Sequence, residues 1–166
     1  MSTNFRREAG AAGRDTRGMF RVHQFNKVEM FAYVLPEDSW DEHERLLAVE
    51  ESLAAVLGIP YRVVNIAAPE LSAAAAKRYD IEGWFPSQQR YRELTSASNT
   101  TDYQARRLGI RYRGEKGTEH VHTLNGTAVT DRWLLAVLEN FQDEGGEVAV
   151  PEVLHPFGAP ARLAGG

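Results

Sequence analysis

The 166-residue sequence contains no cysteine. This absence excludes disulfide bonds, zinc sites with cysteine ligands and thiol nucleophiles. No apolar run approaches the roughly 18 residues that a membrane-spanning helix needs, and the arginine-bearing N-terminus is not followed by the apolar segment of a signal peptide. We therefore expect a cytoplasmic protein that does not contact a membrane.

The chain also lacks an excess of positive charge, since its formal net charge is -4 at pH 7. That balance argues against nonspecific binding of nucleic acid. The hydrophobic content of 43% and the charged content of 25% are close to the averages of globular proteins, and 166 residues suffice for one hydrophobic core. We expect a single domain over residues 1–166.

Against this acidic background, arginine is concentrated in one N-terminal segment, FRREAGAAGRDTRGMFRVHQFNKVE, at residues 5–29. Aromatic and β-branched residues at its end favour strands, and the glycine-rich and alanine-rich middle favours a loop. We interpret the segment as a long hairpin, with a strand over residues 4–9, a loop over 10–18 and a second strand over 19–35.

Strand alternation would gather the charged side chains of this hairpin on one face of a sheet. Arg6 and Glu8 would share a face of the first strand, and Arg21, Phe25 and Glu29 would share a face of the second. Guanidinium groups pair with phosphate through two parallel hydrogen bonds. An aromatic ring can stack on a base, and a carboxylate can accept a hydrogen bond from an exocyclic amine. This face could therefore hold a nucleotide, and the alternative is a solvated face with weak cross-strand ion pairs.

The rest of the sequence predicts three helices and several strands. Ser39 and Glu42 have the spacing of a capping box, at the start of a helix that ends at Gly58. The alanine-rich residues 70–80 predict a second helix, and residues 130–142 predict a third. Strands are expected at 61–67 as a short buried strand, within the aromatic stretch 81–94, on both sides of the turn at 115–117, and at the start of the closing segment 148–157. These elements predict an α+β fold, an antiparallel β-sheet flanked by helices that cover one side.

Two further segments are dense in polar side chains: RYRELTSASNTTDYQARR at residues 90–107 and TLNGTAVTDR at residues 123–132. Mg²⁺ prefers few carboxylates together with substrate phosphates, so Glu93 in the first segment is a candidate ligand. The alternative is ordinary turn chemistry, because Asn125 followed by Gly126 is itself a strong turn signal.

Together these segments resemble the second half of the catalytic domain of a bacterial-type seryl-tRNA synthetase, a class II aminoacyl-tRNA synthetase. Residues 4–30 are similar to the family's motif 2, residues 90–113 to its serine and metal region, and residues 123–142 to its motif 3. The resemblance runs from about residue 4 to residue 157. It implies the class II synthetase fold, ATP-dependent activation of serine to seryl-adenylate, and transfer of serine to tRNA(Ser).

The resemblance implies a set of ATP contacts. Arg6 would hold the α-phosphate and the serine carboxylate, and Glu8 would bind the adenine amine. Arg21 would contact the outer phosphates, and Phe25 would stack on adenine. Arg132, the motif 3 arginine, would hold the γ-phosphate. Arg6 and Arg132 are thus the implied catalytic residues, and ATP and Mg²⁺ are the implied cofactors.

The resemblance also implies metal and serine contacts. Glu93 and Ser96 would lie at Mg²⁺ and the α-phosphate. Glu29 would bind the serine amino group, and Asn125 and Thr127 would help to enclose serine.

Three segments that precede motif 2 in the family have no counterpart in this sequence: the tRNA-binding helical arm, motif 1 of the dimer interface and a Thr-x-Glu loop. The resemblance therefore implies a truncated, partial catalytic domain whose activity is weak or lost. The alternative is a non-catalytic ATP-binding remnant or a regulatory paralogue that associates with a full-length synthetase. Without motif 1, apolar sheet and helix surface should be exposed, which favours a homodimer or other self-association.

Overall fold

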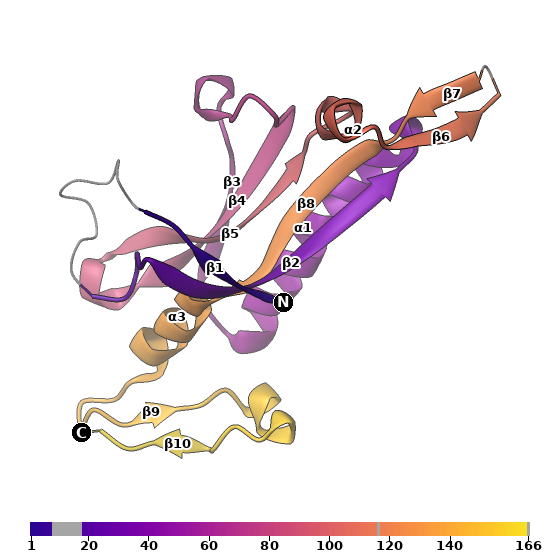
Figure 1. Ribbon diagram of the computed structural model, residues 1–166. Coiled ribbons are helices and arrows are strands. Elements are labelled where there is room, and N and C mark those ends of the chain that lie inside the picture. The colour runs from indigo at the N-terminus through magenta and orange to yellow at the C-terminus, as the bar shows by residue number, and fades with distance from the viewer. Residues whose placement is uncertain (8–17, 116, 166) are drawn as a thin grey trace.

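The computed structural model of the chain describes residues 1–7, 18–115 and 117–165. Its centre is a six-stranded antiparallel sheet in the order β1-β2-β8-β5-β4-β3 (Figure 1). The strands of this sheet are β1 (Ser2–Phe5), β2 (Gln24–Val34), β3 (Tyr61–Asn65), β4 (Lys77–Phe85), β5 (Arg90–Asn99) and β8 (His122–Thr130). The predicted antiparallel sheet and its N-terminal hairpin, formed by β1 and β2, are confirmed.

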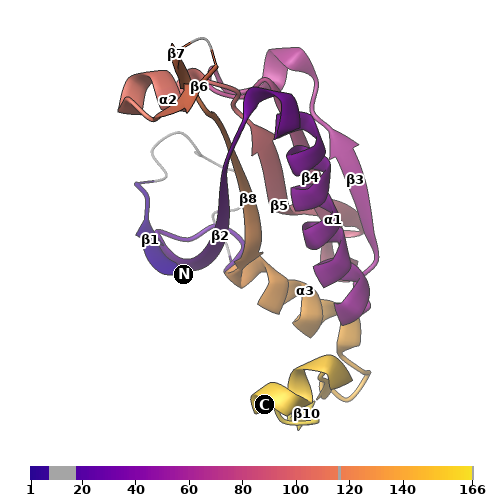
Figure 2. The same ribbon diagram turned by 90° about the vertical axis from the view of Figure 1, so that its right-hand side faces the viewer.

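Two helices, α1 (Ser39–Leu57) and α3 (Asp131–Phe141), pack on the same face of the sheet (Figure 2). The other elements are the helix α2 (Tyr103–Leu108), the hairpin β6 (Arg111–Gly114) with β7 (Gly117–His120), the pair β9 (Val148–Ala149) with β10 (Arg162–Leu163), and the short 3-10 helices η1 (Pro36–Asp38), η2 (Ala68–Glu70), η3 (Pro86–Gln88) and η4 (Glu152–Phe157). Within the described ranges, none of the helices has the length and apolar content needed to cross a membrane.

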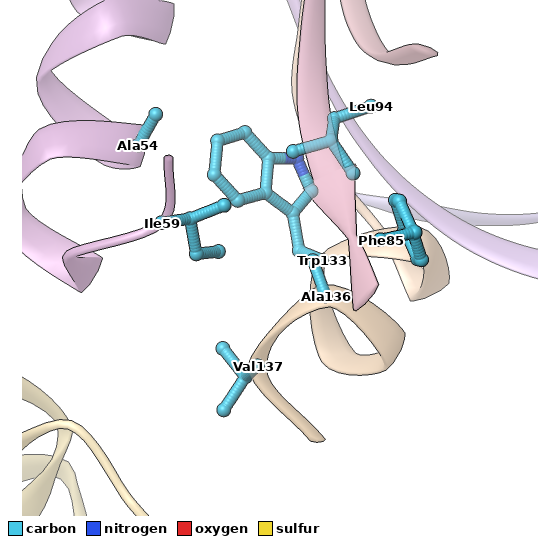
Figure 3. Packing of buried hydrophobic residues seen from close by; sticks show 7 residues of the cluster. All are labelled: Ala54, Ile59, Phe85, Leu94, Trp133, Ala136 and Val137. Carbon is cyan, nitrogen blue, oxygen red and sulfur yellow. The ribbon is translucent and has the colours of Figure 1, made fainter. Parts of the chain in front are cut away.

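The hydrophobic core lies between the two helices and the sheet. Trp133 of α3 is 3% exposed, and its indole projects between Ile59 and Leu94 (Figure 3). The buried members of this cluster are Ala54, Ile59, Phe85, Leu94, Trp133, Ala136 and Val137. Spacings of three and four residues put the buried side chains of α3 on one helical face. The start of α3 is therefore fixed against the sheet, next to residues that the sequence assigned to a binding site.

The helix predicted over residues 70–80 is wrong. The alanines lie in a turn between η2 and β4, and the backbone N–H of Ala76 donates to the carbonyl of Asn99 at 2.8 Å. The strand β4 then pairs with β3 on one side and β5 on the other, which buries Ile81 and Phe85 completely. Alanine favours a helix by less than about 1 kcal/mol per residue, so burial of two large apolar side chains outweighs it.

The capping box predicted at Ser39 and Glu42 is also wrong. The hydroxyl of Ser39 donates to the carbonyl of Pro36 at 3.0 Å, and Glu42 instead pairs with Arg45 at 2.6 Å. Asp38 precedes the helix and makes no capping hydrogen bond with its side chain. The η1 turn brings the Pro36 carbonyl within reach of Ser39, so the serine hydroxyl hydrogen-bonds to that turn and does not cap α1.

Three predicted strands differ in extent or burial. The strand expected over residues 19–35 begins only at Gln24, after bends over residues 18–23, and the first strand spans Ser2–Phe5 within the described residues. The strand expected to be buried over 61–67 is β3, the edge strand of the sheet, where Val63 is 37% exposed. An edge strand has one neighbour only, so it needs fewer apolar side chains than its sequence suggested.

Candidate active site

The two faces of β2 have different neighbours. Met30 and Ala32 pack against the buried cluster that Leu46 of α1 forms with Ala97 and Leu124. Because side chains alternate along a strand, Phe25 and Lys27 point to the opposite face. The candidate site is therefore on the sheet face away from α1.

A pocket of about 270 Å³ opens on this face. Its cationic side chains are those of Arg6, Arg21, Lys27, Arg78 and Arg132, and its carboxylates are those of Glu93 and Asp131. The described part of an acidic chain thus gathers five cationic side chains and two carboxylates around one cavity. That excess of positive charge suits an anion with several negative charges.

Arg6, Arg21 and Phe25 line one cavity, as predicted. Strand alternation accounts only for Phe25, because Arg21 lies in the bends before β2 and Arg6 follows the last residue of β1. The guanidinium of Arg6 lies 4.6 Å from the centroid of the Phe25 ring. The backbone N–H of Arg6 donates to the carbonyl of His23 at 2.9 Å, which continues the β1-β2 pairing by one residue. Glu8, the candidate for the adenine amine, lies outside the described residues.

Arg132 enters the pocket from the first turn of α3. The hydroxyl of Thr130 accepts a hydrogen bond from the Arg132 backbone N–H at 3.3 Å and so caps the helix. The side chain is 22% exposed, and its guanidinium donates to the carbonyl of Glu93 at 2.8 Å. Burial lowers the pKa of Arg132 below its usual value, and the nearby carboxylate of Glu93 opposes this effect. The group remains a cation, because arginine begins from a very high pKa.

Phe20 is a pocket residue that the sequence did not reveal. Two guanidinium groups lie on its ring, with Arg92 at 3.7 Å and Arg132 at 4.5 Å from the centroid. The ring also meets Phe85 of the core edge to face at 5.3 Å. Phe20 therefore joins the arginine-rich segment to the start of α3, and its place in the predicted strand concealed that contact.

The resemblance implies that this pocket binds ATP, and replacing Phe20 with leucine should then weaken that binding by roughly threefold, because the apolar contact is kept while the cation-π contact with Arg132 is lost. Isothermal titration calorimetry with ATP would measure the change. Phe31→Leu is a matched control, since Phe31 is 66% exposed and does not line this cavity. Equal affinities for both variants would contradict an orienting role for Phe20.

The predicted metal residues Glu93 and Ser96 both line the pocket. They lie three residues apart, so strict alternation would put them on opposite faces, but the pairing of β5 with β4 skips Leu94. Together they offer one carboxylate and one hydroxyl, and the described residues contain no group of three or more histidine, cysteine or acidic side chains that could hold a metal. This pair suits Mg²⁺ when phosphates and water supply the remaining ligands.

Arg78 was missed because the sequence predicted a helix around it. From β4 it donates to both carboxylate oxygens of Asp80, at 2.5 Å and 3.0 Å. The same guanidinium lies 3.5 Å from Oε1 of Glu93. Burial raises the pKa of Asp80 to about 6, although the hydrogen bonds from Arg78 act in the opposite direction.

The predicted serine contacts are only partly brought together. Thr127 lines the pocket, and its hydroxyl donates to Oε2 of Glu29 at 3.1 Å. Glu29 also pairs with Lys27 at 2.6 Å, so it contacts two lining residues without lining the cavity itself. Asn125 lies between Phe31 and Ser98 in the sheet and does not line the cavity. The roles of these residues in serine binding stay predictions.

A protein-family model described as tRNA synthetase class II core domain (G, H, P, S and T) matches residues 1–141. The chain belongs to this class II synthetase family. The fold class predicted from the sequence is thereby confirmed.

Relatives of this class II core are named serine–tRNA ligase. The chain is 59% identical over 157 residues to the enzyme of Thermobifida fusca, which covers 94% of the chain and 37% of the relative. It is 58% identical over 158 residues to the enzyme of Thermoplasma volcanium, covering 95% of the chain and 36% of the relative. The predicted resemblance to seryl-tRNA synthetases is confirmed, and the chain spans little more than a third of these relatives.

Solved structures of seryl-tRNA synthetases are also similar to this chain. Seryl-tRNA synthetase from Pyrococcus horikoshii, complexed with ATP, superposes on this class II core with a TM-score of 0.95 and 50% identity, covering 99% of the chain and 37% of that protein. The cytoplasmic serine–tRNA ligase of Naegleria fowleri, in complex with AMP, gives a TM-score of 0.91 and 46% identity over 98% of the chain and 39% of that protein.

Proposed function

We propose that this chain is a catalytic core fragment of a serine–tRNA ligase that binds ATP and activates serine to seryl-adenylate. One observation carries the proposal: the open face of the sheet gathers five cationic side chains around a single pocket. A triphosphate bears several negative charges and fits such a pocket. The similar structure from Pyrococcus horikoshii, which is complexed with ATP, supports the same ligand.

The proposed reaction is an in-line attack of a serine carboxylate oxygen on the α-phosphorus of ATP. A new oxygen–phosphorus bond forms, the bond to the leaving pyrophosphate breaks, and no covalent intermediate with the protein arises. Arg6 would hold the α-phosphate, and Arg21 and Arg132 would hold the outer phosphates. Their part is to position the reactants and to stabilise negative charge, which is the main source of rate in such reactions.

Phe25 and Glu8 would bind the adenine, by stacking and by accepting from its amine. Glu29, Asn125 and Thr127 would bind serine. In this proposal the carboxylate of Glu29 serves as the acceptor for the serine ammonium, and its hydrogen bond from Thr127 holds it in place.

Glu93 and Ser96 would hold Mg²⁺ together with the phosphates. When bound, the ion would neutralise part of the triphosphate charge. The carbonyl of Glu93 already accepts from Arg132 at 2.8 Å, which ties the candidate metal ligand to the motif 3 arginine.

Serine-dependent exchange between ATP and radioactive pyrophosphate, measured with Mg²⁺ present, tests this proposal. We expect exchange above background with serine and none with alanine, because alanine lacks the hydroxyl. ATP binding without any exchange would favour the alternative of a non-catalytic ATP-binding remnant or regulatory paralogue. Absence of both would overturn the proposal.

Transfer of serine to tRNA(Ser), self-association and location in the cytoplasm stay predictions. Exposed apolar side chains support self-association: Phe31 is 66%, Tyr33 is 60% and Leu108 is 72% exposed, and all three line a second pocket.

A further inference from the structure

Arg78 occupies an unusual position between two carboxylates. Its guanidinium donates to both oxygens of Asp80, which is only 7% exposed, and lies 3.5 Å from Oε1 of Glu93. The two bonds to Asp80 fix the plane and direction of the guanidinium, since a bidentate pair restricts both. Arg78 is therefore a cation held at a defined place in the pocket wall.

Glu93 is approached by two guanidinium groups at the same oxygen atom. Arg132 lies 3.7 Å from Oε1 of Glu93, and Arg78 lies 3.5 Å from it. A divalent cation bound to Glu93 would need the lone pairs of this carboxylate. It would also be repelled by two positive charges within a few ångströms.

Arg132 and Arg78 differ in their other hydrogen bonds. Arg132 also donates to the backbone carbonyls of Glu93 and Phe20, at 2.8 Å and 3.4 Å, so its position is tied to the scaffold around α3. Within the described residues, the side chain of Arg78 makes hydrogen bonds to Asp80 alone. The Glu93 carboxylate can therefore turn away from Arg78 without disturbing the scaffold, because Asp80 keeps the guanidinium paired.

We propose that Arg78 is a positioning residue that holds the Glu93 carboxylate when no divalent cation is bound and competes with the cation for it. Arg78 thereby sets the concentration of divalent cation that the nucleotide site requires. This inference rests on the proposed function, in which Glu93 is a ligand of Mg²⁺.

Binding of Mn²⁺ as a probe, followed by electron paramagnetic resonance in the presence of a non-hydrolysable ATP analogue, tests the inference. We expect R78Q to bind Mn²⁺ at least about threefold more tightly than the unmodified chain, because one competing positive charge is gone. Unchanged or weaker binding would overturn the inference.

The single variant leaves Asp80 buried without its partner, which can destabilise the fold. The double variant R78Q/D80N removes the whole pair. It should also bind Mn²⁺ more tightly than the unmodified chain, because Glu93 is released from Arg78, but less tightly than R78Q, because a carboxylate is lost with the cation. R62Q/E82Q is the matched control, since Arg62 and Glu82 form a similar pair at 2.6 Å outside the pocket. That control should bind Mn²⁺ like the unmodified chain, and tighter binding there would overturn the inference.

E93Q separates failure of this inference from failure of the proposed function. Loss of Mn²⁺ binding in E93Q places the ion at Glu93, and an unchanged R78Q/D80N would then overturn only the role of Arg78. Mn²⁺ binding that E93Q leaves intact would overturn the inference and the proposed metal site together. Serine-dependent exchange is measured separately and decides the proposed activity by itself.

Discussion

Replacing Arg132 with alanine should lower the affinity of the chain for ATP by roughly 10- to 100-fold. The estimate follows from the 1.5–3 kcal/mol that a charge-assisted hydrogen bond typically contributes. Arg132 is 22% exposed and faces the pocket from the capped first turn of α3, so its guanidinium is presented in a fixed direction. Isothermal titration calorimetry with ATP would measure the loss, and serine-dependent exchange should fall to background.

Two comparison variants sharpen this experiment. Arg132→Lys keeps the charge but loses the planar fork, so we expect an intermediate affinity. Arg113→Ala removes an exposed arginine in β6 that does not line the pocket, and it should bind ATP normally. Circular dichroism must confirm that Arg132→Ala is folded, because Arg132 also donates to the carbonyl of Glu93. A folded Arg132→Ala with unchanged ATP affinity would exclude a role at the γ-phosphate.

Local patterns in the sequence predicted the helices and strands whose buried side chains recur at the spacing typical of that element. The helix over residues 131–141 was visible because its apolar residues recur every three or four positions. Alternation along β2 likewise predicted the face on which Phe25 lies, and Phe25 lines the cavity. In both cases the pattern of a single element contains the information.

The errors arose where contacts between distant segments decided the structure. Arg78 was hidden in an alanine-rich stretch, whose weak helix propensity is overridden when β4 is paired on both sides. Glu93 and Ser96 share the pocket only because the register of β5 skips Leu94, and an irregularity of pairing leaves little trace in one strand's sequence. Phe20 gains its role from arginines far along the chain.

The roles of the site residues came from the resemblance to a family and not from periodicity. Charge pattern alone left open whether the arginine-rich face was a nucleotide site or a solvated face. The pocket favours the first reading for Arg6, Arg21 and Arg132, which all line it. It does not extend to Asn125, whose predicted contact with serine would require serine to reach further along β8 than the cavity does.

Glu50 is a buried carboxyl group beneath the site. It is 0% exposed in α1, Oε2 accepts from the hydroxyl of Thr95 at 3.0 Å, and Oε1 has no hydrogen-bond partner among the described residues. Burial raises the pKa of Glu50 to about 8. The hydrogen bond from Thr95 and the charge of Lys27 lower it, and the charges of Glu29 and Asp80 raise it. Glu50 is therefore protonated in the folded chain at neutral pH.

This pKa predicts a loss of stability as the pH rises. Between the ordinary carboxyl pKa of 4.5 and about 8, the unfolded chain has lost the Glu50 proton while the folded chain retains it. The free energy of unfolding must therefore fall across this interval, and the full penalty is reached above it. Each tenfold change in the ionisation constant corresponds to about 1.4 kcal/mol, so the full penalty is on the order of 5 kcal/mol.

Replacing Glu50 with glutamine should remove this penalty, because the amide keeps the shape and can still accept from Thr95 but does not ionise. Urea unfolding at pH 5, 7 and 9 would measure the difference in free energy between variant and unmodified chain. We expect that difference to grow in favour of Glu50→Gln with rising pH, and to stay flat for the control Glu70→Gln, which changes an exposed carboxylate. A difference for Glu50→Gln that is equal at all three pH values would mean that the folded state does not hold this proton. In that case Glu50 would be ionised directly beneath Thr95, which lines the candidate site.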